Sequence, residues 1–282
     1  MDDQRRDIAA GYMCQEVINN PDASAPLIVP IAVFRNTTRA VINDNIRANS
    51  ARDNAWVKVQ EPHGCPAVLC GGGPSLGDCI DEIRQRQADG AAVYALNGAA
   101  KFLRDHGVTP DAQVMVDARI ESLPLLDAET PGHFLASQVN PALFDAAPRA
   151  MLFHTLMDDI WDLLPEHRRE EVPLIGGGAS VGLSATCLAY VLGHRELHCY
   201  GYDSSHAVGA SHAYAQPMND IIPTLATVWG GRTYVSSVAM KAQAEMFLIL
   251  ARSLIEVGAE IHVHGDGLLP AMFNTPPEVL TE

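Results

Sequence analysis

The chain has 282 residues, of which 48% are hydrophobic and 19% charged, and its formal net charge is -15 at pH 7. These values are typical of a globular protein with a full core and exclude an intrinsically disordered chain. The acidic charge opposes the counterion release on which binding to duplex nucleic acid depends, so no duplex nucleic-acid partner is expected.

Membrane insertion and secretion are not indicated either. No apolar run reaches the roughly 18 residues that a membrane span needs, and the segment from Met1 to Arg6 lacks the apolar core of a secretory signal. The 6 cysteines include no C-x-x-C pair, which favours buried free thiols over zinc ligands or disulfides. We expect a cytoplasmic protein without a membrane partner, and the composition is compatible with a homo-oligomer.

The first part of the chain, residues 1–62, has scattered polar residues and one apolar run at 26–34 that contains prolines. Proline donates no hydrogen bond to a sheet, so a central strand is not expected there. We interpret 1–62 as an N-terminal extension packed on a main domain, 63–282, which binds a nucleotide.

From residue 67 onward, short apolar runs alternate with amphipathic segments, an order that predicts parallel strands joined by helices. The candidate strands are 67–70, 91–96, 112–117, 133–137, 150–153, 197–200 and 260–263. The candidate helices are 75–88, 98–106, 180–192 and 237–257. The expected fold class is α/β, a Rossmann-like and mostly parallel sheet with helices on both faces, whose ligands bind beyond the carboxyl ends of the strands.

A glycine turn follows the first candidate strand and consists of Gly71, Gly72, Gly73, Pro74 and Ser75. Glycine lets the backbone approach a ligand closely, and the free amides of a helix start attract an anion. With Ser75 as the helix cap, the turn predicts a cradle for the phosphate of a nucleotide. The alternative is a tight turn between strand and helix that holds no ligand.

A second glycine turn contains Gly178 and Ser180 and repeats this design before the third candidate helix. We expect the two turns to face one crevice, with Gly178 and Ser180 also contacting the nucleotide. The alternative is chance recurrence in a chain that is rich in glycine.

Asn97 and Gly98 follow the second candidate strand, where a nicotinamide enzyme would place a carboxylate for the ribose. NAD is therefore not favoured. An uncharged amide can lie beside the phosphate or sugar of another nucleotide, whereas the alternative role of this pair is turn formation. The chain has no Walker loop, so an ATP donor would be held in another way.

Charged and titratable side chains follow two later strands. Asp117 suits a metal ion or ribose hydroxyls, and Arg119 suits a phosphate, although the two could also form a surface ion pair. In the polar loop after 197–200, either His206 or His212 is a candidate general base or acid.

Asp203, in the same loop, is the candidate group that orients the catalytic histidine. Solvated loop histidines without a catalytic role are the alternative for both imidazoles. We interpret two further histidines on a late strand, His262 and His264, as structural.

Several stretches in this order resemble one superfamily of proteins. These stretches are 71–76, 95–97, 109–117, 178–181, 192–197 and 201–203. The superfamily joins archaeal 6-hydroxymethyl-dihydropterin diphosphokinases, flagellar motility accessory factors and, more remotely, bacterial sialyltransferases that use CMP-sialic acid. The resemblance covers about residues 65–270 and is strongest to members that bacteriophages encode.

The resemblance implies a Rossmann-like fold with a nucleotide bound across the strand ends. In the sialyltransferases the first glycine turn and the asparagine contact the CMP moiety, and here these are 71–75 and Asn97. That branch carries a His-Ser pair as its base where this chain has 234–237, so the base would move to the polar loop. The diphosphokinase branch needs a divalent cation, for which Asp117 and Asp203 are the candidate ligands.

We therefore expect a nucleotide-dependent transferase that uses an ATP-type or CMP-type donor and a small-molecule acceptor, with Mg²⁺ as a candidate cofactor. Pyrophosphoryl transfer of the 6-hydroxymethylpterin diphosphokinase type is favoured, because the length suits it and the sialyltransferase base is missing. Transfer of a glycosyl group from a nucleotide-activated sugar is the alternative. A non-catalytic phage assembly or binding protein with a vestigial nucleotide pocket is the second alternative.

Overall fold

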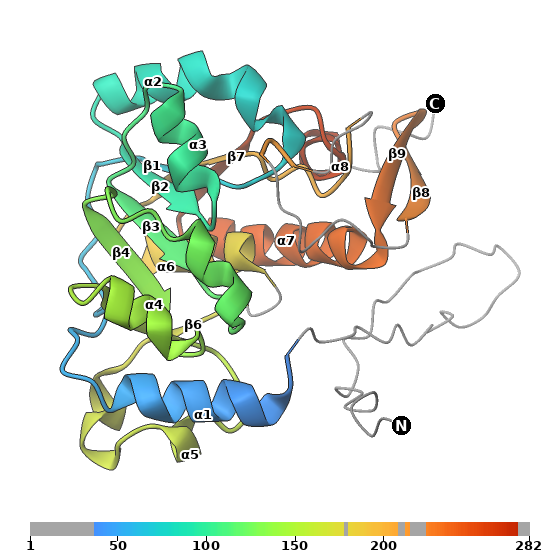
Figure 1. Ribbon diagram of the computed structural model, residues 1–282. Helices are drawn as coiled ribbons and strands as arrows, with labels where there is room; N and C mark the ends of the chain where they lie inside the picture. The colour runs from blue at the N-terminus through green and yellow to red at the C-terminus, as the bar shows by residue number, and fades with distance from the viewer. Residues whose placement is uncertain (1–36, 178–179, 208–211, 215–223, 276–282) are drawn as a thin grey trace, which may run out of the picture.

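The computed structural model describes residues 37–177, 180–207, 212–214 and 224–275 (Figure 1). Within them an 8-stranded sheet has the order β10-β7-β1-β2-β3-β4-β5-β6, and its neighbouring strands are parallel. Strands β8 and β9 form a separate antiparallel hairpin. The predicted α/β, Rossmann-like fold class is confirmed.

Each predicted strand is present. The strands of the main sheet are β1 (Ala67–Cys70), β2 (Ala92–Leu96), β3 (Ala112–Met115), β4 (Gly132–Ala136), β5 (Met151–Thr155), β6 (Leu174–Ile175), β7 (Glu196–Tyr200) and β10 (Glu260–Val263). The hairpin, β8 (Thr224–Trp229) and β9 (Arg232–Ser237), was not predicted. The sequence signal of this hairpin is a pair of glycines between two segments in which apolar and polar residues alternate.

Three of the four predicted helices are present within one residue at each end, whereas 75–88 is divided into a 3₁₀ helix at 74–79 and an α-helix at 80–88. The α-helices are α1 (Arg39–Ser50), α2 (Ile80–Ala88), α3 (Ala99–Asp105), α4 (Pro141–Ala146), α5 (Ile160–Leu163), α6 (Val181–Val191), α7 (Val238–Glu256) and α8 (Leu268–Asn274). Short 3₁₀ helices are η2 (Pro74–Cys79), η3 (Ile120–Leu125) and η4 (Glu166–Glu171). No helix of the described residues combines the length and apolar character needed to cross a membrane.

Helices cover both faces of the central strands, which explains why these strands are apolar runs. All four residues of β1 are buried. Leu69 packs in one cluster with Leu188 of α6 and Phe247 of α7, whereas Val68 packs in the opposite cluster with Leu103 of α3. The two layers hold the carboxyl ends of the strands in fixed positions.

The described part of the predicted N-terminal extension packs on this sheet. Helix α1 buries Ile46 together with the amide side chains of Asn45 and Asn49. The chain then runs beside β5, where Trp56 forms a parallel bridge with Leu152. The rest of the extension lies outside the described residues.

Candidate functional site

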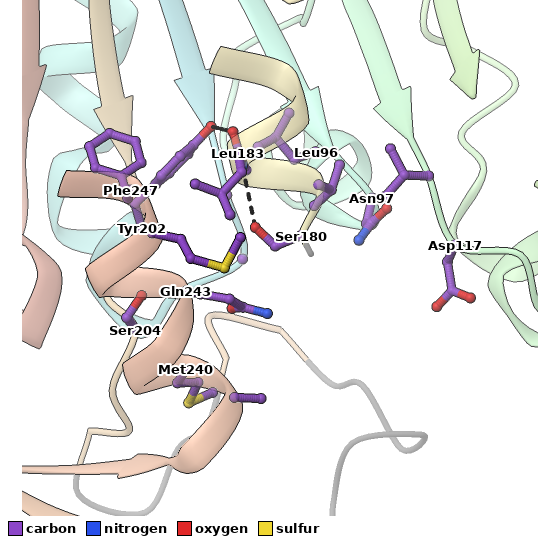
Figure 2. A pocket seen from close by; sticks show the side chains of 18 of the residues that line it. Leu96, Asn97, Asp117, Ser180, Leu183, Tyr202, Ser204, Met240, Gln243 and Phe247 are labelled. Atoms are coloured by element: carbon purple, nitrogen blue, oxygen red, sulfur yellow. Dashed lines mark hydrogen bonds between the residues drawn. The ribbon is translucent and has the colours of Figure 1, made fainter. Parts of the chain in front are cut away.

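A cavity of about 570 Å³ lies at the carboxyl ends of β1, β2, β3 and β7 (Figure 2). The strand order reverses here, because β1 pairs with β2 on one side and with β7 on the other. A ligand crevice is expected at such a switch point of an open parallel sheet. The starts of α1, α6 and α7 also contribute to the wall.

The glycine turn after β1 forms part of the wall through Gly71, Gly72 and Gly73. The Gly71 N–H donates to the carbonyl of Tyr200 at 2.7 Å, and the Gly73 N–H donates to that of Gly201 at 2.8 Å. Glycine is required because a Cβ at Gly71 or Gly73 would lie 2.5 or 2.6 Å from the Gly201 oxygen. Two of the amides that we expected to face a phosphate therefore join the turn to the end of β7 and to the residue that follows it.

Ser75 does not cap the helix, so this prediction is wrong. The 3₁₀ helix η2 follows Gly73 and has no side-chain cap. Instead, the Ser75 N–H donates to Asp203 Oδ2 at 2.9 Å, and the Ser75 hydroxyl donates to Asp203 Oδ1 at 2.6 Å. Pro74 and Ser75 both lie outside the residues that line the cavity.

Asp203 is the anion that this turn holds. Its side chain is buried, and neighbouring glycines leave it no spare room: a Cβ at Gly267 would lie 2.4 Å from its Cα. Burial raises the pKa of Asp203, and the two bonds from Ser75 act in the opposite direction. Asp203 also lines the cavity. Ser75 donates one bond to each of its oxygens, and its roles as a metal ligand and as the partner of a catalytic histidine stay predictions.

The start of α6 lines the cavity. Ser180, Val181, Gly182 and Leu183 line the cavity, and Ser180 Oγ accepts from the Leu183 N–H at 3.3 Å. The first amides of a helix have no partner within it and form the positive end of its dipole. An anion in the cavity would therefore be stabilised here. Gly178 lies outside the described residues.

Asn97 presents an unpaired acceptor at the cavity wall. It adopts the left-handed conformation, with φ of 48°. Its backbone is tied down, because its N–H donates to the carbonyl of Val114 and its own carbonyl accepts from Gln113 Nε2. Its Oδ1 atom, in contrast, is buried and has no hydrogen-bond partner among the described residues. An unpaired buried acceptor beside a cavity suits a ligand donor such as a hydroxyl or amino group.

Gly98 makes room for a neighbouring ring and lies outside the cavity lining. A Cβ at Gly98 would lie 2.7 Å from Cε2 of Tyr214, which does line the cavity. The structure thus gives Gly98 a packing role, and its contact with a nucleotide stays a prediction.

Asp117 and Arg119 bind each other. Asp117 lines the cavity (Figure 2), and its Oδ2 lies 2.6 Å from Nη2 of Arg119. The Arg119 N–H also donates to Asp117 Oδ1 at 2.9 Å. The bond to Asp117 raises the pKa of Arg119. This is the ion pair that we gave as the alternative, and Arg119 lies outside the cavity lining.

The structure brings only one of the two candidate catalytic histidines to the cavity. His212 lines the cavity, and its ring centroid lies 6.5 Å from that of Tyr214. His206 forms a bridge with Val235 of β9 and lies outside the lining. Its Nε2 atom is buried without a partner among the described residues.

Sequence reasoning missed the contributions of α1 and α7. Arg39 of α1 lines the cavity and pairs with Asp159, and it is the one lysine or arginine in the described lining. Met240, Met246 and Phe247 of α7 give the cavity an apolar side. No motif marks these positions, because their role depends on packing between segments that are distant in the sequence.

The chain matches the family described as "6-hydroxymethylpterin diphosphokinase MptE-like" over residues 42–209. No curated protein matches it. Among solved structures, that of the MAf glycosyltransferase from Magnetospirillum magneticum AMB-1 is similar, with a TM-score of 0.62 and 18% identity. The similarity covers 83% of this chain but 38% of that one, and at this identity it shows the fold alone.

Proposed function

Because the chain belongs to the 6-hydroxymethylpterin diphosphokinase MptE-like family, we propose that its cavity binds the nucleotide-activated donor of a transferase reaction. The observation that carries the proposal is Asn97, which lines the cavity and whose buried Oδ1 has no hydrogen-bond partner among the described residues. A nucleotide supplies the donor that this atom lacks, through a ribose hydroxyl or a base amino group. Its phosphate would lie at the start of α6.

The charge of the cavity favours glycosyl transfer over pyrophosphoryl transfer. Ser75 donates to Asp203 and Arg119 pairs with Asp117, so the Mg²⁺ that ATP requires would have to compete with these contacts for either carboxylate. Arg39 is the one lysine or arginine in the described lining, which suits a donor with one phosphate, such as a CMP-activated sugar. The proposal of glycosyl transfer therefore reverses the preference for pyrophosphoryl transfer that chain length and the missing sialyltransferase base suggested.

In the proposed reaction His212 accepts the proton of an acceptor hydroxyl, whose oxygen forms a bond with the anomeric carbon of the donor sugar. The bond from that carbon to the phosphate oxygen breaks, and the nucleotide leaves with the electron pair. The amides at the start of α6 stabilise its negative charge. Met240 and Phe247 pack against the apolar parts of the substrates.

A diphosphokinase is the second candidate, because the family description names this activity. Asp117 lies at the carboxyl end of β3 and lines the cavity, so it could hold Mg²⁺ after releasing Arg119. This candidate predicts that ATP binds only together with Mg²⁺.

The test compares the binding of CMP, CDP, ADP and ATP, with and without Mg²⁺, by thermal shift and calorimetry. Asn97→Gly removes the side chain but tolerates the left-handed backbone. It should weaken CMP binding by about fivefold to tenfold, as expected for one lost hydrogen bond. The variant without nucleotide should melt close to the original chain, which separates lost binding from lost folding.

The absence of binding by all four nucleotides at millimolar concentration would contradict the proposal, and so would an unchanged CMP affinity in Asn97→Gly. Stabilisation by ATP that depends on Mg²⁺, without any effect of CMP, would favour the diphosphokinase.

A further inference from the structure

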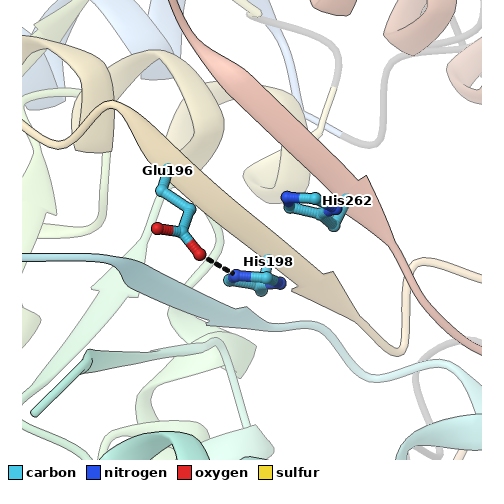
Figure 3. Close-up of side chains that lie close together, drawn as sticks. All are labelled: Glu196, His198 and His262. Carbon is cyan, nitrogen blue, oxygen red and sulfur yellow. Dashed lines mark hydrogen bonds and ion pairs between the residues drawn. The ribbon is translucent and has the colours of Figure 1, made fainter. Parts of the chain in front are cut away.

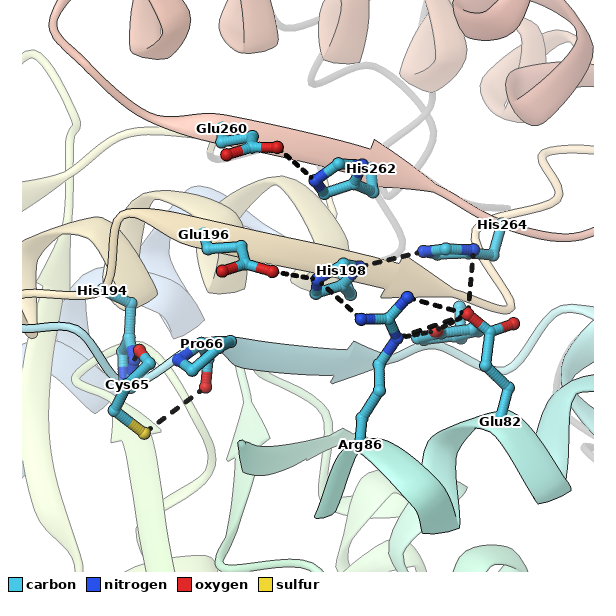
Figure 4. Close-up of polar contacts among 11 residues, drawn as sticks. Cys65, Pro66, Glu82, Arg86, His194, Glu196, His198, Glu260, His262 and His264 are labelled. Atoms are coloured by element: carbon cyan, nitrogen blue, oxygen red, sulfur yellow. Dashed lines mark hydrogen bonds and ion pairs between the residues drawn. The ribbon is translucent and has the colours of Figure 1, made fainter. Parts of the chain in front are cut away.

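Two adjacent strands carry the same pattern of glutamate and histidine. In the parallel pair β7 and β10, Glu196 is the register partner of Glu260, and His198 is the partner of His262. Side chains two residues apart on a strand share a face. The four side chains therefore lie together on one face of the sheet (Figure 4). None of them lines the cavity.

The ligand atoms of this group converge. Ring nitrogens of His198 and His262 and a carboxylate oxygen of Glu196 all lie within 4.8 Å of one another (Figure 3). His198 Nε2 lies 2.9 Å from Glu196 Oε1, and His262 Nε2 lies 3.0 Å from Glu260 Oε1. The two imidazole rings stack with centroids 4.5 Å apart. Bonds of about 2.0–2.2 Å from one zinc ion to nitrogen and oxygen need only small movements from this arrangement.

We propose that Glu196, His198 and His262 bind a divalent transition-metal ion of the zinc class. Two imidazoles and one carboxylate suit Zn²⁺, Co²⁺ or Ni²⁺, whereas Mg²⁺ and Ca²⁺ prefer oxygen ligands alone. Glu260 completes the site, as a fourth ligand or as the hydrogen-bond partner of His262. The ion would tie the edge strand β10 to β7.

The surroundings of His198 hold its ring in place. Its side chain is buried, with 3% exposed. Its Nδ1 atom lies 3.1 Å from Nε2 of His264, a contact that fixes the ring orientation. The side chains of His262 and Glu196 are 38% and 45% exposed, so an ion can reach the site from solvent.

One positive charge opposes the ion. Arg86 Nη1 lies 3.0 Å from His198 Nε2 and would have to leave that nitrogen. Arg86 is also held by Glu82, at 2.9 Å from Nη2, and by the Tyr200 hydroxyl, at 2.6 Å from Nε. The metal therefore displaces one contact of Arg86 and leaves the others in place. Glu82 pairs with Arg86, whereas Glu196 and Glu260 lie beside His198 and His262 (Figure 4).

The test uses the full chain without an affinity tag, freed of metal by a chelating resin. Calorimetry with ZnCl₂ should give one strong site per chain, and Co²⁺ should produce the visible absorption of a site with nitrogen and oxygen ligands. His262→Asn should weaken Zn²⁺ binding at least about tenfold, since even a lost partner of a metal ligand costs 10- to 100-fold. His106→Asn, at an exposed position on the C-cap of α3, is the matched control.

Glu196→Gln provides a second variant with the same expected loss. Failure of micromolar Zn²⁺ to bind would overturn the proposal, as would unchanged affinity in His262→Asn and Glu196→Gln. Because the site lies outside the cavity, CMP binding should be the same in these variants as in the original chain. A failure here is therefore distinguishable from a failure of the proposed transferase function.

Discussion

At the scale of single residues, the bond between Ser75 and Asp203 decides what the first glycine turn can do. The turn contains the donors expected of a phosphate cradle, yet Asp203 accepts from the Ser75 N–H and from its hydroxyl. A carboxylate supplied by the chain thus takes the place of a ligand anion there. The site proposed for a phosphate is therefore the start of α6, which also lines the cavity.

This bond predicts how Asp203→Asn changes stability with pH. Below about pH 4, the usual pKa of an aspartate, Asp203 is protonated in both the folded and the unfolded chain. As the pH rises, the unfolded chain ionises first, because burial raises the pKa in the folded state. The contribution of Asp203 to stability therefore falls between pH 4 and that raised pKa. The substituted asparagine does not ionise, so the variant should gain stability relative to the original chain from pH 4 to 7.

Urea unfolding at several pH values measures this difference. The asparagine amide can keep both contacts, because its oxygen accepts from the Ser75 N–H and its nitrogen donates to the Ser75 hydroxyl. Asp203→Ala is the matched control: it leaves the donors of Ser75 unpaired and should be about 1–3 kcal/mol less stable than Asp203→Asn at every pH, since neither side chain titrates. A difference between Asp203→Asn and the original chain that shrinks with rising pH would contradict the expected sign of the effect.

The sequence identified the members of this contact but not the contact itself. Gly73, Ser75 and Asp203 were each expected at the site, from glycine chemistry and from their positions after strands. The bond spans 128 residues of the chain, and a single sequence does not encode which distant donor and acceptor meet. The orphaned Oδ1 of Asn97 is likewise visible only in three dimensions, although its position after β2 was correctly inferred.

At the scale of elements, helix α1 is held against the sheet by hydrogen bonds from asparagine side chains and not by a broad apolar face. Asn49 Nδ2 donates to the carbonyls of Ser137 and Val139 at 2.9 and 2.8 Å, and these bonds are buried. Asn49→Ala should leave both carbonyls unpaired and lower the free energy of unfolding by about 1–3 kcal/mol. Arg47→Ala, on the exposed side of the same helix, should change it far less.

Urea unfolding of the two α1 variants checks this prediction, and equal losses would show that the buried amide bonds are not what holds the helix. The position of α1 also affects the cavity, because Arg39 lies at the start of this helix and lines the cavity. Asn49→Ala should therefore also weaken nucleotide binding if α1 shifts.

The elements of the sheet were predictable because burial on both faces makes β1 and its neighbours continuous apolar runs. Helix α6 was predictable from its serine cap. The role of α1 was not predictable, because asparagines that bind loop carbonyls give the same sequence pattern as asparagines in solvent. The hairpin of β8 and β9 was missed although Gly230 and Gly231 mark its turn.

At the scale of the whole molecule, buried histidines predict a chain that loses stability in mild acid. Burial lowers the pKa of His154, His194, His198 and His264. These residues lie on β5, on β7, and next to β7 and β10, so the effect is spread over the sheet. Below about pH 6.5 the unfolded chain binds protons that the folded chain does not, and stability falls as the pH decreases.

His154 is the sharpest case and can be tested alone. It is fully buried against Trp56, and its pKa is lowered to about 3. Between pH 7 and 5 it should therefore remove about 2 kcal/mol of stability. His154→Phe keeps an aromatic ring there without a titrating group. Between pH 7 and 5 this variant should therefore lose about 2 kcal/mol less stability than the original chain, as measured by urea unfolding. His106→Phe at an exposed position is the control, and a pH dependence that His154→Phe leaves unchanged would show that the proton uptake belongs to the other histidines.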